Sequence, residues 1–475
     1  MTNEYDVIVI GAGTGGYVAA IRAAQLGLKV ACVEKQKSLG GTCLIWGCIP
    51  TKALLEHAHA LKVVQGAKEW GVTIGDGSSL PVSIDMKQVH ARKDKIVTGL
   101  TKGVEFLFKK NKIDWIKGTA RLAGNGVVDV FEGDTQALKA TKEIIVATGS
   151  SPRSVPGITI DNERIITSDQ AIHMKVVPKT IAIMGSGAVG VEFASIFRSF
   201  GAEVTIIELL PSLVPVEDEA VSAELQKSFR KKGITVHTGT KVTSARVKGD
   251  GVDLQAALPD GTTKDIRAEY LLVATGRGPV TTGLDLEKLG VEMERGYIKV
   301  DTMYRTNVPG VSALGDVITL GATPHPQLAH VSSAEGIVTA ERIAGHDVHP
   351  INYSHVPGCT YSDPEIGSVG LTEKAAIEKG YDVRVGTFPF GVLGRAKMAG
   401  ETEGFVKIVA EKKYDEILGV HMIGLRSTEL VAEATLALRL ESTVEELIRT
   451  IHAHPTIAEA VGEAAHATHG AAIHI

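Results

Sequence analysis

Residues 7–16 read VIVIGAGTGG, and this stretch decides the fold of the first part of the chain. Its apolar beginning, 7–10, is typical of a buried strand, and Gly11, Gly13 and Gly16 follow at GxGxxG spacing. In this pattern Gly11 permits a tight turn, Gly13 lets backbone approach a pyrophosphate, and Gly16 lets a helix pack closely against the strand. The stretch therefore predicts the start of a dinucleotide-binding βαβ unit.

The next residues complete this unit. An alanine-rich segment over 18–26 predicts a helix, and an apolar segment over 29–33 predicts a second strand that leads into Glu34. The N-terminus of such a helix offers N–H groups and a positive dipole to phosphate, and an acid about 20 residues further on accepts hydrogen bonds from ribose. We therefore expect Glu34 to bind a ribose.

The same pattern recurs in the middle of the chain. A strand predicted over 180–184 precedes Gly185, Gly187 and Gly190, and a helix and a second strand then lead to Glu208. The first glycine and the acid are 23 residues apart in both units. This identical spacing predicts two dinucleotide sites in one chain.

Two further features accompany the units. The segment 209–215, LLPSLVP, contains no Arg or Lys that could hold a 2′-phosphate, so the second site should prefer NAD over NADP. Each unit also ends in a similar strand and turn, at 144–149 and 271–276, which suggests backbone turns close to each cofactor.

The pattern changes after about residue 350, where Gly-rich turns before helices are no longer found. Strands are expected over 405–410 and 417–423, and an amphipathic helix over 429–440. We expect an α/β fold with two Rossmann-type nucleotide-binding domains and a C-terminal α+β domain for association.

Composition limits the possible partners and location. The 475 residues carry a net charge of −5, which gives no basic excess for nucleic acid or an anionic membrane surface. Four cysteines are too few for a disulfide-stapled secreted fold, so a reducing compartment is expected. The sequence also has no recognisable signal peptide and no apolar stretch long enough to span a membrane, and we expect a cytoplasmic protein.

Cys43 and Cys48 stand five residues apart in GGTCLIWGCIPTK, residues 40–52. On an ideal helix their Cα atoms would be about 8.6 Å apart, whereas a disulfide needs less than about 7 Å. A bridge therefore requires a distorted helix, which Gly47 and Pro50 permit, and a strained bridge is easily reduced. A redox pair is favoured, and a metal site and two inert thiols are the alternatives; no second Cys or His pair at zinc spacing supports the metal.

The chain resembles the flavin disulfide reductases of the pyridine nucleotide-disulfide oxidoreductase family, and within them the dihydrolipoamide dehydrogenase group, the E3 components of 2-oxo acid dehydrogenase complexes. The resemblance extends over essentially the whole chain. It rests on the cysteine motif, the two nucleotide units, ALGD at 313–316 and HAHPTIAE at 452–459.

The resemblance implies FAD and NAD as cofactors and no metal. The residues implied for FAD are Gly11, Gly13, Gly16, Glu34, Gly41, Thr42, Lys52, Gly118, Thr148, Asp316 and Ala329. Those implied for NAD are Gly185, Gly187, Gly190, Glu208, Val242 and Gly276.

The resemblance also implies catalytic roles for six residues: Cys43, Cys48, Lys52, Glu192, His454 and Glu459. A substrate dithiol is expected to attack Cys43, with Cys48 lying nearer the flavin and Lys52 supplying positive charge. His454, oriented by Glu459, is expected to act as the base in the partner subunit's site, so the active form is a homodimer. Glu192 is expected near Lys52 and the nicotinamide. The other C-terminal histidines, His452, His466, His469 and His474, are expected to be ordinary surface residues.

The domains implied are 1–150 for FAD, 151–276 for NAD, 277–348 as a central segment completing the FAD domain, and 349–475 for dimerisation. The function implied is oxidation of protein-bound dihydrolipoyl groups, with lipoyl domains of 2-oxo acid dehydrogenase complexes or the glycine cleavage system as partners. The alternatives are an NAD(P)H-dependent reductase of a low-molecular-weight disulfide and a non-catalytic scaffold. Trp46 and the long stretch 317–328, with Pro324, depart from the family pattern.

Overall fold

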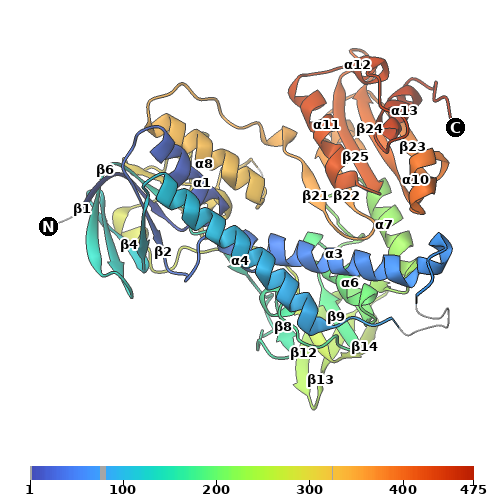
Figure 1. Cartoon of the computed structure of the whole chain (residues 1–475), viewed down its shortest axis with the longest axis horizontal. Coiled ribbons are helices and arrows are strands. Elements are labelled where there is room, and N and C mark those ends of the chain that lie inside the picture. Colours follow the sequence, from blue (N-terminus) through green and yellow to red (C-terminus); the bar gives the residue numbers. More distant parts are fainter. Residues whose placement is uncertain (1–2, 75–81, 324) are drawn as a thin grey trace. The chain divides into compact units, whose positions relative to one another are not determined.

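The computed structural model describes residues 3–74, 82–323 and 325–475, so Pro324 lies outside the described residues. The chain divides into two units (Figure 1). Unit 1 comprises Met1–Ala53, Lys87–Arg153 and Gly276–Ile351, and unit 2 comprises Leu54–Met86, Ser154–Thr275 and Asn352–Ile475. Each unit therefore gathers three segments that are distant in the sequence.

Unit 1 is built on a sheet in the order β3-β2-β1-β6-β5-β4, with β19 also beside β6. Strands β3, β2, β1, β6 and β19 run parallel, and β4 and β5 add antiparallel strands at one side. Both faces of β1 are buried: Val7 and Val9 pack in one hydrophobic cluster, and Ile8 and Ile10 in another. This double burial explains why residues 7–10 of β1 form a continuous apolar run. Helices α1 and α8 lie side by side in Figure 1.

The strands of unit 1 are β1 (Asn3–Ile10), β2 (Val30–Glu34), β3 (Asp114–Lys117), β4 (Thr119–Gly124), β5 (Val127–Phe131), β6 (Gln136–Val146), β7 (Ser150–Pro152), β16 (Arg277–Pro279), β17 (Met293–Glu294), β18 (Tyr297–Lys299), β19 (Val311–Ala313) and β20 (Ile318–Thr319). Its helices are α1 (Thr14–Gln25), α2 (Gly41–Ile45), the first turns of α3 (Cys48–Gln65), α4 (Met86–Lys110), which starts at the last residue of a unit 2 segment, α8 (Ala329–Ile343), and the 3₁₀ turns η2 (Glu287–Leu289) and η3 (Gly315–Val317).

Unit 2 repeats the strand–helix–strand arrangement in a parallel sheet of order β11-β10-β9-β15-β8. Beside it stands an antiparallel sheet of β12, β13 and β14. The elements of this part are β8 (Ile165–Ile166), α5 (Ser168–Ala171), β9 (Thr180–Met184), α6 (Ala188–Ser199), β10 (Glu203–Ile207), α7 (Glu219–Lys231), β11 (Thr235–His237), β12 (Lys241–Lys248), β13 (Gly251–Ala257), β14 (Thr263–Ala268) and β15 (Tyr270–Val273), with η1 (Ala67–Trp70) after α3.

The C-terminal part of unit 2 is an antiparallel sheet of order β21-β22-β25-β24-β23. Helices α11 and α13 pack on it through a hydrophobic cluster that includes Val420, Met422, Ala434 and Val461. All residues of β25 are buried, because α7 and α9 contribute to the packing of this sheet as well.

The remaining elements are η4 (Tyr353–His355), β21 (Gly358–Thr360), β22 (Ile366–Gly370), α9 (Glu373–Glu378), β23 (Val383–Pro389), η5 (Phe390–Val392), α10 (Gly394–Ala399), β24 (Gly404–Glu411), β25 (Ile417–Gly424), α11 (Ser427–Arg439), α12 (Val444–Arg449) and α13 (Glu459–Thr468). The α/β class expected from the sequence is confirmed. Among the described residues, no helix combines the length and the apolar character that crossing a membrane requires.

Candidate active site

The first glycine loop of unit 1 joins β1 to α1 and leaves no room for side chains at two of its positions. Gly11 has a φ of +99°, and a Cβ there would lie 2.5 Å from the Ala147 carbonyl oxygen. A Cβ on Gly16 would lie 1.9 Å from the Gly11 oxygen, whereas one on Gly13 would meet nothing within 4 Å. Helix α1 has no side-chain cap and no acid in its first turn, so its positive end fits a pyrophosphate.

The second loop, in unit 2, repeats this geometry between β9 and α6. A Cβ on Gly185 would lie 2.5 Å from the Ala274 oxygen, and one on Gly190 would lie 2.1 Å from the Gly185 oxygen. A Cβ on Gly187 meets nothing within 4 Å, and α6 also lacks a side-chain cap and a first-turn acid. The close contacts of Gly11 with Ala147 and of Gly185 with Ala274 explain why each βαβ unit is followed by a strand and turn of similar sequence.

Glu34 and Glu208, the acids at the ends of the two βαβ units, are buried and accept hydrogen bonds from their own glycine loops. Glu34 accepts hydrogen bonds from the N–H groups of Ala12 and Gln36, both at 2.8 Å. Glu208 accepts from the N–H of Ser186 at 2.7 Å, from its hydroxyl at 2.8 Å and from the Leu210 N–H at 2.8 Å. A carboxylate has about four lone-pair sites, so each acid can still accept hydrogen bonds from the hydroxyl groups of a ribose. Ribose binding by Glu34 and Glu208 stays a prediction.

Three other residues expected at the FAD site lie in unit 1 close to the loop or to its sheet. Gly41 lies against the loop, because a Cβ on it would be 2.5 Å from the Gly13 Cα. Gly118, with a φ of +148°, donates its N–H to the Glu34 carbonyl at 3.1 Å. The Thr148 hydroxyl donates to the Val280 carbonyl at 2.6 Å.

The cysteine pair spans a break between two helices of the same unit. Helix α2 ends at Ile45 and α3 begins at Cys48, so Trp46 and Gly47 interrupt the helix between the two sulfurs. Gly47 is required at the break, because a Cβ there would lie 2.8 Å from the Thr42 oxygen. Cys43 and Cys48 are both reduced in the structure and hydrogen-bond to each other. The disulfide expected for the resting protein stays a prediction.

Two charged residues act on this pair. The pKa of the Cys43 thiol is raised, first by the hydrogen bond with Cys48, then by burial and by the charge of Cys48. Lys52, one turn along α3 from Cys48, opposes this increase, and Asp316 adds to it. Four of the residues expected from the sequence are thus brought together: the two cysteines, Lys52 and Asp316.

A polar chain beside the thiols was missed by the sequence analysis. The Arg277 guanidinium donates to the Ser150 hydroxyl at 2.7 Å, and this hydroxyl donates to the Asp316 carboxylate at 2.5 Å. Arg277 also reaches the Thr42 hydroxyl at 3.5 Å. Their position in the sequence could have marked Ser150 and Arg277 as candidates, because each directly follows the glycine that ends a strand and turn.

The start of α8, where Ala329 lies, belongs to the same unit. Helix α8 packs on α1 so closely that a Cβ on Gly336 would lie 2.6 Å from the Gly15 oxygen. Glu335 on α8 accepts the Gly315 N–H at 2.7 Å and contacts His325 Nε2 at 2.7 Å. The chain around Asp316 is therefore tied to α8.

The residues expected at the NAD site are less uniform in their surroundings. Glu192 lies on α6 with 3% of its surface exposed, and its carboxylate accepts the Tyr361 N–H at 2.9 Å. Val242 on β12 is buried in a hydrophobic cluster with Leu271. Gly276 has a φ of +106° and starts the last segment of unit 1.

His454 and Glu459 form the expected pair near the C-terminus. His454 Nδ1 and Glu459 Oε1 are 2.8 Å apart, while Glu459 Oε2 accepts the Thr456 N–H at 2.9 Å. Burial tends to raise the pKa of Glu459, but the hydrogen bonds from His454 and Thr456 outweigh it and the pKa is lowered. The His454 side chain is 78% exposed, so its imidazole is accessible while its orientation is fixed.

This pair lines a cavity of about 240 Å³ in unit 2. Other lining residues include His452, His466 and His474. The expectation that His452 is an ordinary surface residue is wrong: its side chain is 10% exposed and pairs with Glu433 at 2.8 Å. The reason is that His452 packs against Gly462 of α13, where any Cβ would meet the imidazole at 2.9 Å.

Comparisons with known proteins agree with these features. A family model described as pyridine nucleotide-disulphide oxidoreductase matches residues 5–336, and the dimerisation domain of that family matches residues 356–465. The dihydrolipoyl dehydrogenase of Bacillus subtilis (strain 168) is 44% identical over 485 residues, with 100% of both chains covered. The leghemoglobin reductase of Glycine max is 43% identical, over 98% of this chain and 88% of that protein.

The crystal structure of LpdA from Mycobacterium tuberculosis is similar in fold, with a TM-score of 0.86 and 26% identity over 98% of this chain and 99% of that one. The family and the α/β fold class expected from the sequence are therefore confirmed, and the expected domain bounds stay predictions. The chain belongs to the pyridine nucleotide-disulphide oxidoreductase family.

Proposed function

We propose that the protein is an NAD-dependent dihydrolipoyl dehydrogenase, which oxidises dihydrolipoyl groups to the lipoyl disulfide. The observation that carries this proposal is the pair of hydrogen-bonded thiols, Cys43 and Cys48, next to the charge of Lys52 and in the same unit as the first glycine loop. Relatives named dihydrolipoyl dehydrogenase that align over the full chain support the substrate.

FAD is proposed to bind in unit 1, at the loop of Gly11, Gly13 and Gly16, and NAD in unit 2, at the loop of Gly185, Gly187 and Gly190. In both loops the space around the middle glycine is open and the following helix has no side-chain cap, which suits a pyrophosphate. A flavin held at the first loop would supply two-electron transfer between the thiol pair and a nicotinamide held at the second loop.

The thiol chemistry belongs to the chain itself. In the oxidised protein, one substrate thiolate attacks Cys43 and breaks the bond to Cys48, which leaves as a thiolate. The second substrate thiolate then attacks the mixed disulfide and releases Cys43, so that the substrate is oxidised and the cysteine pair reduced. The pKa of Cys43 is raised by its hydrogen bond with Cys48 and by burial, so the reduced pair retains a proton between its two sulfurs.

His454 is proposed to accept the substrate proton, with Glu459 holding the imidazole through Nδ1. The family's dimerisation domain contains both residues. We therefore propose a homodimer in which this pair acts in the partner subunit's site. We further propose lipoyl domains of 2-oxo acid dehydrogenase complexes or of the glycine cleavage system as partners, and a cytoplasmic location.

The change Cys48→Ser tests the proposal. The purified protein should be yellow and should reduce NAD⁺ with dihydrolipoamide. The variant should keep its flavin but lose activity by at least about a hundredfold, because no disulfide can form. Flavin absorbance and NADH formation measure the two results.

The matched control is Cys359→Ser, which changes a half-buried cysteine on β21 in unit 2 and should retain activity. A colourless parent protein, or full activity in Cys48→Ser, would contradict the proposal. A panel of lipoamide, glutathione disulfide and coenzyme A disulfide, each with NADH and NADPH, separates it from reduction of a low-molecular-weight disulfide.

A further inference from the structure

An extended segment after β21 holds helix α6 at two points that are nearly one turn apart. The Tyr361 N–H donates to the Glu192 carboxylate at 2.9 Å, and the Asp363 N–H donates to the Ser195 hydroxyl at 3.1 Å. Alternate N–H groups of an extended segment point the same way, and positions i and i+3 share one face of a helix. The spacing of the two N–H groups, at Tyr361 and Asp363, therefore matches the spacing of Glu192 and Ser195 on the helix. The Tyr361 N–H holds the carboxylate of Glu192.

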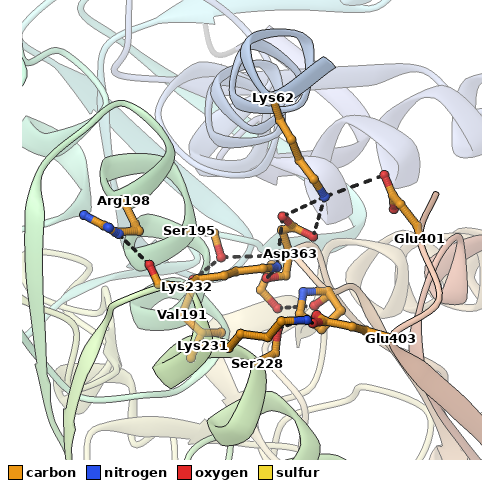
Figure 2. Close-up of polar contacts among 12 residues, drawn as sticks. Lys62, Val191, Ser195, Arg198, Ser228, Lys231, Lys232, Asp363, Glu401 and Glu403 are labelled. Carbon is orange, nitrogen blue, oxygen red and sulfur yellow. Dashed lines mark hydrogen bonds and ion pairs between the residues drawn. The ribbon is translucent and has the colours of Figure 1, made fainter. Parts of the chain in front are cut away.

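Asp363 is itself held by two lysines, as Figure 2 shows. Its carboxylate lies 3.2 Å from Nζ of Lys62 on α3 and 3.0 Å from Nζ of Lys232, just after α7. Lys232 also donates to the Asp363 carbonyl at 2.5 Å, so the Lys232 ammonium group contacts both the backbone and the carboxylate of Asp363. Although burial tends to raise the pKa of Asp363, the two lysines lower it, and the charged form is favoured.

The surrounding contacts connect this cluster to α6 a second time. Arg198, also on α6, donates to the Lys232 carbonyl at 2.6 Å. Ser195 returns its own hydrogen to the Val191 carbonyl at 3.0 Å. In Figure 2, Glu401 approaches Lys62 from the far side, at 3.6 Å. All these residues belong to unit 2, and the Asp363 carboxylate is the group that both Lys62 and Lys232 contact.

We propose that Asp363 is a positioning residue for hydride exchange with the nicotinamide: through its lysine pairs it fixes the 361–363 backbone, which orients Glu192. The inference rests on the proposed NAD site at α6, because Glu192 is expected next to the nicotinamide ring. Without the negative charge, Lys62 and Lys232 repel each other, and the segment keeps only the hydrogen bond from Lys232 to the Asp363 carbonyl as its link to the lysines. Glu192 then keeps its burial, but the hydrogen bond that the Tyr361 N–H donates to its carboxylate is weakened.

The variant Asp363→Asn keeps the size and the backbone N–H of this residue, removes the charge and replaces one carboxylate oxygen by an NH2 group that cannot accept from a lysine. We expect kcat for NADH oxidation with ferricyanide to fall about tenfold, because a small displacement of a group at the reacting centre slows the reaction strongly. The dissociation constant of NADH, from fluorescence titration, should stay within about twofold, because the glycine loop and Glu208 are unchanged. Amide exchange of Tyr361 should become faster.

A double variant separates positioning from general weakening. If Asp363 acts through Glu192, then Asp363→Asn added to Glu192→Gln should cause no further loss of kcat. Multiplied losses, or an unchanged kcat in Asp363→Asn, would overturn the proposal. The control Glu401→Gln changes the outer partner of Lys62 and should behave like the parent. Should Asp363→Asn not fold, Ser195→Ala removes the acceptor of the Asp363 N–H, together with the hydroxyl's own bond to the Val191 carbonyl, and must give the same kinetic pattern.

The choice of ferricyanide makes the two proposals separable. A parent protein that oxidises NADH with ferricyanide but does not oxidise dihydrolipoamide would contradict the proposed substrate and leave the positioning test intact. A parent that oxidises dihydrolipoamide, with Asp363→Asn indistinguishable from it in both reactions, would overturn the role of Asp363 alone.

Discussion

Gly190 shows how a single methyl group can select between the two cofactors. A Cβ at this position would lie 2.1 Å from the Gly185 oxygen, which forces α6 away from β9. We expect Gly190→Ala to weaken NADH binding at least about tenfold, because the N–H groups of α6 no longer meet the pyrophosphate. Flavin content should not change, because the other loop is in unit 1.

Fluorescence titration with NADH and flavin absorbance measure these two effects. The control is Gly99→Ala on α4, where a Cβ meets nothing within 4 Å and alanine favours the helix. Equal NADH affinity in Gly190→Ala and the parent protein would show that this close approach is not needed for binding.

The sequence predicted residues that act through their local backbone, and the family resemblance supplied Glu192, but hydrogen-bond partners that lie far apart along the chain were missed. Gly16 and Gly190 follow from the spacing within one short stretch. The bond between Arg277 and Ser150 joins residues 127 positions apart, and that between Tyr361 and Glu192 joins residues 169 apart. No local pattern marks such pairs, because the two partners lie in segments that are far apart in the sequence.

Helix boundaries show how tertiary packing overrides propensity. The helix expected over 18–26 begins earlier, at Thr14, and ends at Gln25. Gly15 and Gly16 are poor helix formers, but the close packing of α8 at Gly15 and of Gly16 on Gly11 keeps this turn helical. The strands expected over 405–410 and 417–423 differ by no more than one residue at each end from β24 and β25, whose apolar residues leave little ambiguity.

Strand β25 carries a histidine that makes stability depend on pH. His421 donates from Nε2 to the Leu371 carbonyl at 2.9 Å, and Asp218 and Lys407 are the charged groups that act on it. Burial lowers its pKa below the ordinary 6.5, against the opposing effects of Leu371 and Asp218. The unfolded chain therefore takes up the proton first as the pH falls below 6.5, and stability is lost there.

We expect His421→Gln to reduce the loss of Tm between about pH 7.5 and about pH 5.5, because this group contributes at most about 1.4 kcal/mol for each pH unit in that window. His452 provides a control of opposite sign, because its hydrogen bond to Glu433 raises its pKa and its contribution is lost as the pH rises. His452→Gln should therefore enlarge the same difference. An identical pH profile for His421→Gln and the parent protein would exclude this role.

The sequence of the whole molecule showed that the nucleotide-binding pattern occurs twice. It did not show which distant segments of the chain come together in each compact unit. The two glycine loops share their 23-residue spacing, so two nucleotide units could be predicted. Units 1 and 2 each assemble three distant segments, and the chain passes between them within α3. A helix that continues through such a boundary leaves no change in composition, so domain limits taken from linkers alone stay predictions.

The proposed homodimer can be tested by combining two inactive subunits. His454→Gln removes the base and Cys43→Ser removes the sulfur that the substrate attacks, so each variant alone should be inactive. If the pair at His454 serves the partner subunit's site, a mixed dimer has one site with both intact residues. With equal mixing and free exchange, half of the dimers are mixed, and about a quarter of all sites should recover NAD⁺ reduction. Mixing His454→Gln with Glu459→Gln, which affect the same pair, should recover far less. No recovery after verified subunit exchange would place His454 in the site of its own subunit or outside the reaction.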